Sequence, residues 1–183
     1  MVLISFQSLI KSMNNNNFII KLIIFIVIGL LLTSFTSVKW KENKKFRIKI
    51  HKSISETFNS GDYIISLSEN DSEITIITEN NSIIGYMIVS TSFSKNTTFD
   101  YFIIYNNKAE ILKVEVLKYR ENYGYEICNK KWLNKFIGLS FNSEFELNNK
   151  VDGISGATIS VNSITSAIYK KTDKLNKFIK WDY

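Results

Sequence analysis

The residues with the clearest chemical potential form a run of small and polar side chains in the last third of the chain. This run extends from Asp152 to Ser160 and reads Asp-Gly-Ile-Ser-Gly-Ala-Thr-Ile-Ser. Its glycines let the backbone turn tightly and approach a ligand closely. Hydroxyl groups on Ser155, Thr158 and Ser160 can donate or accept hydrogen bonds, and they can also serve as points of attachment.

A helix is predicted directly after this run. Apolar side chains recur at helical spacing from Val161 to Ile179, and Ser160 is a candidate N-cap residue. Thr158 is therefore expected just ahead of a helix N-terminus, where unpaired N–H groups and the helix dipole favour a phosphate. The residues alone predict a tight turn, an exposed hydroxyl and a site for an anion.

The run from Asp152 to Thr158 resembles the flavinylation motif of the FMN-binding domain family, Asp-x-x-Ser/Thr-Gly-Ala-Thr/Ser. That family includes flavin-bearing components of the Rnf electron-transport complex and of the sodium-translocating NADH:quinone oxidoreductase. Its members receive FMN from FAD through a separate flavin transferase. The resemblance implies a covalent phosphodiester bond between FMN and Thr158, with cofactor-binding roles for Asp152, Ser155, Gly156 and Ala157. An ordinary turn between a strand and a helix is the alternative interpretation.

A second stretch, residues 119–138, resembles another part of the same family. Glu121 and Gly124 match its Glu-Thr-x-Gly-x-Gly segment, which lies near the flavin ring in the family, and both are candidate cofactor-binding residues. Asn122 stands where the family usually has Thr, and residues 125–126 replace its second glycine region. Aromatic side chains in this stretch are compatible with a flavin contact or with packing on a sheet: Tyr123, Tyr125 and Trp132.

The composition excludes several other kinds of site. Cys128 is the only cysteine, so neither an intrachain disulfide nor a cysteine-based metal site can form, and we expect it to be a small buried side chain. His51 is the only histidine, which argues against a histidine metal site or a Ser-His-Asp triad. We expect it on the surface of a connecting helix. The net charge of +6 forms no basic stripe interleaved with aromatic residues, so no nucleic-acid partner is predicted.

An apolar segment near the N-terminus predicts export or membrane attachment. Leu22 to Val38 gives 17 uncharged residues, at the short edge of what can span a bilayer. This segment is either a transmembrane anchor or a signal peptide ending near residues 33–37, and a buried core helix is the third possibility. We therefore divide the chain into a signal or transmembrane segment (1–38), a basic linker with a short helix (39–61), and an FMN-binding domain (62–183).

The topology of such an anchor is ambiguous from the charges. Basic residues are more numerous after the apolar segment, from Lys39 to Lys49, than before it. The positive-inside rule alone would therefore place the C-terminal side in the cytoplasm. The flavin-bearing domains of the family usually face away from the cytoplasm. From this resemblance we expect the flavin domain on the extracytoplasmic side.

The rest of the chain predicts an α+β domain. The short helix of the linker, with Ile50, Ile54 and Phe58 spaced four apart, is expected to end at Gly61. Beyond it, β-branched and aromatic residues favour five strands. Their expected ranges are 63–67, 73–78, 83–90, 98–105 and 110–119, with asparagine pairs at 80–81 and 106–107 as turn formers. The expected fold is an antiparallel sheet with helices packed toward one side, preceded by one N-terminal hydrophobic helix.

The resemblance implies a membrane-tethered or exported electron-transfer protein, in which FMN carries the electrons and the protein holds and tunes it. A redox carrier is favoured over a stand-alone oxidoreductase, so no catalytic residue and no metal ligand is assigned. The implied partners are a flavin transferase, the membrane, and donor and acceptor proteins that the sequence does not identify. Two alternatives stay open: a small flavoenzyme with non-covalent FMN, and a non-flavin binding module anchored to the membrane.

Overall fold

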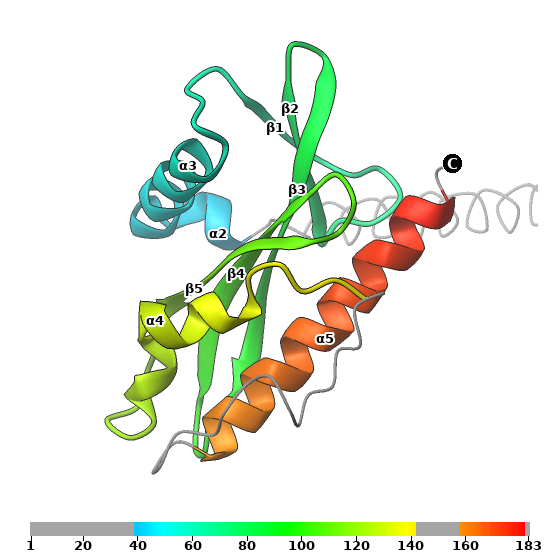
Figure 1. Ribbon diagram of the computed structural model, residues 1–183. Helices are drawn as coiled ribbons and strands as arrows, with labels where there is room; N and C mark the ends of the chain where they lie inside the picture. The colour runs from blue at the N-terminus through cyan, green and yellow to red at the C-terminus, as the bar shows by residue number, and fades with distance from the viewer. Residues whose placement is uncertain (1–38, 142–157, 182–183) are drawn as a thin grey trace, which may run out of the picture. The chain divides into compact units, whose positions relative to one another are not determined.

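The computed structural model describes residues 39–141 and 158–181 (Figure 1). After a single helical turn, α2 (Lys39–Glu42), the chain forms one compact unit that starts at Glu42. The predicted N-terminal segment, 1–38, lies outside the described residues, as do Asp152, Ser155, Gly156 and Ala157. Among the helices that the structure describes, none is long and apolar enough to span a bilayer.

The unit is built on one five-stranded antiparallel sheet in which each strand pairs with the next along the chain. The strands are β1 (Ile64–Leu67), β2 (Ile74–Glu79), β3 (Ser82–Phe93), β4 (Thr98–Asn106) and β5 (Ile111–Lys118). All five predicted strands are present, and the antiparallel α+β class is confirmed. Asn80 and Asn81 form the β2–β3 turn with φ angles of 49° and 61°, which asparagine tolerates better than most residues.

One face of the sheet carries the main hydrophobic core. Alternate residues of β4 point to this face, because successive side chains of a strand lie on opposite sides. They pack against the buried stripe of α5 (Thr158–Trp181), a helix of 24 residues. The principal contacts come from Phe99, Tyr101, Ile103 and Tyr105 on the strand and from Val161, Ile164, Ile168 and Leu175 on the helix.

The opposite face of the sheet is covered by α3 (Lys44–Phe58), as Figure 1 shows. Ser53 of α3 donates a hydrogen bond to Glu115 of β5 at 2.9 Å, and Lys49 forms an ion pair with Glu115 at 3.0 Å. Helices therefore cover both faces, whereas the sequence predicted them toward one side. The stripe at Ile50 and Ile54, interpreted as part of a linker helix, is fully buried.

The end of α3 also differs from the prediction. The helix ends at Phe58 and not at Gly61, because Asn59 takes a left-handed conformation with φ 50° and caps the helix. His51 lies exposed on this helix, as expected, and its ring stacks on Tyr63 with 5.8 Å between centroids.

Three short helices follow β5 and close one edge of the core. They are η1 (Tyr125–Cys128), α4 (Lys130–Leu133) and η2 (Asn134–Phe136). Trp132 is buried against Phe136, with 5.4 Å between ring centroids. Cys128 is half-buried against the same core, and this burial raises the pKa of its thiol to about 11. Trp132 is thus a core residue, and Cys128 is a poorly ionised thiol.

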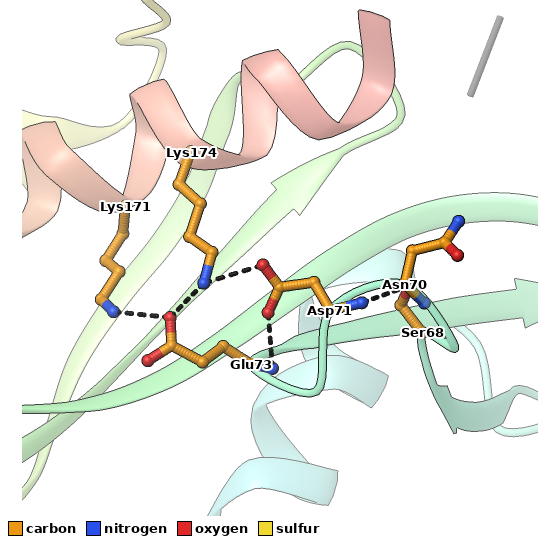
Figure 2. A network of polar contacts seen from close by, with 6 residues as sticks. All are labelled: Ser68, Asn70, Asp71, Glu73, Lys171 and Lys174. Atoms are coloured by element: carbon orange, nitrogen blue, oxygen red, sulfur yellow. Dashed lines mark hydrogen bonds and ion pairs between the residues drawn. The ribbon is translucent and has the colours of Figure 1, made fainter. Parts of the chain in front are cut away.

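The C-terminal half of α5 is held to the β1–β2 connection by ion pairs (Figure 2). Lys174 Nζ lies 2.8 Å from Asp71 Oδ2 and 2.5 Å from Glu73 Oε2. Lys171 Nζ lies 2.9 Å from the same Glu73 oxygen. The helix is therefore fixed to the sheet by charge at this end, in addition to its apolar packing.

Candidate functional site

A cavity of about 250 Å³ lies beside the first turn of α5. It is assembled from three parts of the chain: the β3–β4 turn, the loop after β5, and the start of α5. The residues that line it are Lys95, Glu121, Tyr123, Gly124, Thr158, Ile159 and Ser160. The two stretches singled out in the sequence are thereby brought together, because Glu121 and Gly124 line the same cavity as Thr158.

Thr158 is the first residue of α5, and its side chain is exposed. The helix begins earlier than the periodicity predicts, because the apolar stripe becomes regular only from Val161. Ser160 is consequently the third helical residue and not the N-cap. The amide groups of this first turn have no partner within the helix and carry the positive end of its dipole. The Thr158 hydroxyl therefore lies where a phosphate would be stabilised.

The loop after β5 is tied to this helix by hydroxyl groups. Tyr119 donates its proton to the carbonyl oxygen of Tyr123 at 2.6 Å. A phenol has a single proton to donate, so the contact of 2.9 Å between Tyr119 Oη and Ser160 Oγ has Ser160 as its donor. Ser160 is buried, and this bond fixes the loop against the helix N-terminus.

Gly124 is required by the same arrangement. Its φ is +76°, which side chains other than glycine rarely adopt, and a Cβ atom there would lie 2.7 Å from Tyr119 Oη. The second clash would be with Ser160 Oγ, at 2.9 Å. Gly124 thus permits the close approach of loop and helix that forms one wall of the cavity.

Glu121 joins the loop to the β3–β4 turn. Its Oε1 accepts hydrogen bonds from Ser94 Oγ at 2.5 Å, from Asn96 N at 2.6 Å and from Thr97 N at 2.7 Å. The Ser94 hydroxyl and the Asn96 amide hold the pKa of Glu121 below its ordinary value. Glu121 therefore stays ionised and acts as a brace for the turn that carries Lys95.

Exposed aromatic and apolar side chains form part of the lining of the cavity. Tyr123 and Ile159 line it and are 78% and 54% exposed. Tyr125 follows Tyr123 by two residues, is exposed, and packs edge-on against Tyr119. Of the three aromatic residues considered from the sequence, Tyr123 is thus the one that lines the cavity.

The sequence did not single out Lys95 or Tyr119 as site residues, and it interpreted Ser160 as a cap. A lysine in a turn between strands has no distinctive sequence pattern, and Tyr119 is indistinguishable from other strand aromatics. Their roles depend on the pairing of β3 with β4 and on the position of α5. The remaining predicted residues, Asp152 and Ser155–Ala157, lie outside the described part of the chain.

The residues present fit FMN and offer little to a metal ion. Within residues 39–141 and 158–181, no group of three or more His, Cys, Asp or Glu side chains could hold a metal. A cation and a helix N-terminus suit a phosphate, and the exposed Tyr123 and Ile159 suit an aromatic ring. The cavity is below the usual range of about 300–1,000 Å³ for ligand pockets, so it would enclose part of FMN only.

Comparison with known proteins agrees with this chemistry. No curated protein matched the chain. Residues 93–172 match the model of the FMN-binding domain family, from the last residue of β3 into α5. This segment contains every lining residue that falls within the described part of the chain. Residues 93–172 are therefore similar to the FMN-binding domain family, and this match supports flavin binding by this part of the chain.

Proposed function

We propose that this protein carries FMN covalently, through a phosphodiester bond to Thr158 Oγ1, and transfers electrons as a membrane-tethered or exported carrier. The observation that supports attachment most directly is the position of Thr158. Its exposed side chain is at the first residue of α5, in a cavity shared with Glu121 and Gly124 and inside the family-matched segment. Asp152 and Ser155–Ala157 are proposed to complete the motif that a flavin transferase recognises.

The attachment reaction is a phosphoryl transfer from FAD. The bond between Thr158 Oγ1 and phosphorus forms as the P–O–P bond of FAD breaks, AMP leaves, and the hydroxyl proton passes to a base of the transferase. The amide groups at the start of α5 stabilise the negative charge that remains on the phosphodiester. No oxidation or reduction occurs in this step.

After attachment, the protein has a holding role. FMN supplies the redox chemistry, whereas the loop after β5 and the first turn of α5 fix where the cofactor lies. Tyr123 and Ile159 offer an apolar surface to an aromatic ring, and no residue of the chain is assigned a catalytic role. A covalent bond would also prevent loss of the cofactor outside the cytoplasm.

The test is co-expression of the full chain with a flavin transferase, followed by intact mass and in-gel flavin fluorescence after denaturation. We expect a mass gain of FMN less one water and a fluorescent band. Thr158→Ala should abolish both, because it lacks the attacking oxygen. Thr158→Ser should retain both, and Ser166→Ala, which removes a hydroxyl two turns along the same helix, should behave as wild type.

The alternatives give different results in the same experiment. A non-covalent flavoenzyme would show an unmodified mass, with FMN co-purifying and released on denaturation. A binding module without flavin would show neither signal under any condition, and its properties would not depend on the Thr158 hydroxyl. Unmodified wild-type mass in the presence of an active transferase would sink covalent attachment.

A further inference from the structure

We propose that Lys95 binds the phosphate group of the flavin, so that the site selects FMN over riboflavin. This inference rests on the proposed function, because it concerns the same cavity. Lys95 lies outside both stretches that resemble the family motifs, on the turn between β3 and β4. The fold therefore brings Lys95 to the cavity, and neither sequence motif contains it.

The cavity contains one charge of each sign among its described lining residues. Among its described lining residues, Lys95 is the cation and Glu121 is the anion. A phosphate entering this space would be repelled by the Glu121 carboxylate unless a positive charge offset it. The described part of the chain offers Lys95 no carboxylate within ion-pair distance. Its ammonium group therefore remains available to a phosphate.

The Glu121 carboxylate already accepts hydrogen bonds from the β3–β4 turn. Three donors, from Ser94, Asn96 and Thr97, converge on one oxygen of its carboxylate. These bonds offset part of its charge and spread it over the turn. The net effect of the pair on a phosphate is therefore attractive, because no described carboxylate pairs with Lys95, whereas the charge of Glu121 is partly compensated.

The turn that carries Lys95 is held in place by hydrogen bonds of the residues beside Lys95. The turn is closed by Ser94 N, which donates to Thr97 O at 2.8 Å, and the Glu121 bonds hold it against the loop after β5. That loop is in turn fixed to α5 through Tyr119 and Ser160. Hydrogen bonds from the residues beside Lys95 to Glu121, the short chain from Glu121 back to Tyr119, and the Tyr119–Ser160 bond thus connect this turn to the first turn of the helix that bears Thr158. Such preorganisation lowers the entropic cost of binding.

The proposal is tested by titrating the unmodified full chain, made without transferase, with FMN and with riboflavin, and following flavin fluorescence. We expect Lys95→Gln to raise the Kd for FMN about tenfold, in keeping with loss of a charge-assisted hydrogen bond, and to leave the Kd for riboflavin unchanged. Lys95→Arg should retain the preference for FMN. Lys108→Gln, which removes the same charge from the exposed β4–β5 turn, is the matched control and should behave as wild type.

Salt gives an independent readout of the same contact. Because the cavity is open to solvent, the preference of the wild-type protein for FMN should shrink as ionic strength rises. The Lys95→Gln protein should show less salt dependence. A neutral packing role for the lysine stem would leave the ratio of the two Kd values independent of salt.

The Glu121→Ala variant separates a positioning role of Glu121 from simple charge repulsion, because the two roles predict opposite changes in FMN affinity. Simple repulsion predicts that Glu121→Ala tightens FMN binding, since a negative charge is removed. If Glu121 positions the turn, the same variant weakens FMN binding and reduces the preference for FMN over riboflavin. Tighter FMN binding by Glu121→Ala would overturn the positioning role.

The outcomes separate this inference from the attachment at Thr158. Equal FMN affinities for Lys95→Gln and wild type, or no preference of the wild-type chain for FMN over riboflavin, would overturn the assignment of Lys95. If the co-expressed chain nevertheless gains covalent FMN, the proposed function stands without it. If Lys95→Gln loses the preference but no mass gain is seen with transferase, only covalent attachment fails.

Discussion

At the scale of single residues, Gly124 shows how one backbone position controls the wall of the cavity. Its left-handed conformation lets the loop after β5 pass close to the hydroxyl groups of Tyr119 and Ser160. A methyl group there would be strained by its own backbone and would also displace both oxygens. The hydrogen bond between these oxygens is the connection between loop and helix.

We predict that Gly124→Ala lowers the free energy of unfolding by about 1–3 kcal/mol, through backbone strain and loss of that connection. Urea unfolding measures the change. Gly61→Ala is the matched control, because a Cβ there meets no atom within 4 Å and its φ is not in the left-handed region. An unfolding midpoint for Gly124→Ala equal to that of Gly61→Ala would contradict this account of the loop.

Sequence reasoning found the cavity residues whose types are distinctive and missed those whose role is positional. Glu121, Gly124 and Thr158 belong to recognisable stretches, and all three line the cavity. Lys95 contributes because the β3–β4 turn lies beside the loop after β5, which only the register of the sheet determines. The sequence patterns located the strands but did not place this turn beside the loop.

At the scale of elements, the two ends of α5 have different roles, one in the cavity and one in fixing the helix to the sheet. Its N-terminal turn contributes to the cavity, and its C-terminal half is fixed to the β1–β2 connection by Lys171 and Lys174 (Figure 2). The Lys174 and Lys171 hydrogen bonds hold the pKa of Glu73 below its ordinary value of 4.5. Burial alone would lower the pKa of Lys174, but its bonds to Asp71 and Glu73 raise it.

These shifts predict how stability depends on pH. Because the pKa of Glu73 is lower in the folded state, the unfolded state binds more protons around that pKa, and stability rises with pH there. The contribution is present above pH 4.5 and is lost as pH falls through the lowered pKa. We expect Glu73→Gln to cost about 0.5–1 kcal/mol at pH 7, a modest value because the pair is partly exposed.

Urea unfolding between pH 7 and pH 3 tests this prediction. The difference between Glu73→Gln and wild type should shrink toward zero at the acid end, and it should shrink in concentrated salt at pH 7. Glu69→Gln, an exposed residue of the same connection, is the control and should match wild type throughout. A difference that is constant across this pH range would mean that charge is not what fixes α5 here.

The elements themselves were largely predictable, whereas their packing was not. Runs of Ile, Val, Thr, Tyr and Phe located all five strands, since β-branched and aromatic residues suit a pleated surface. The start of α5 was placed three residues late because Thr158 and Ile159 are exposed and add nothing to the apolar periodicity. The position of α3 on the second face depends on contacts with β5 that no local pattern encodes.

At the scale of the whole molecule, the proposal requires the domain from Glu42 onward to lie on the extracytoplasmic side of the membrane. We predict that a C-terminal alkaline phosphatase fusion to the full chain is active and that a fusion lacking residues 1–38 is not. The reason is that the apolar run Leu22 to Val38 would direct export. An inactive full-length fusion, with a fluorescent cytoplasmic reporter at the same position, would place the domain in the cytoplasm.

The cavity has a consequence for the order in which the protein is made. Lys95, Glu121 and Thr158 are far apart in the sequence and meet only when β4, β5 and α5 have packed together. A nascent or unfolded chain presents the threonine without its surroundings. If the transferase acts on this assembled site, maturation must follow folding. The amount of attached flavin, visible as yellow colour, would then measure the amount of correctly folded protein. A destabilised variant would lose its flavin before the amount of protein in the cell falls.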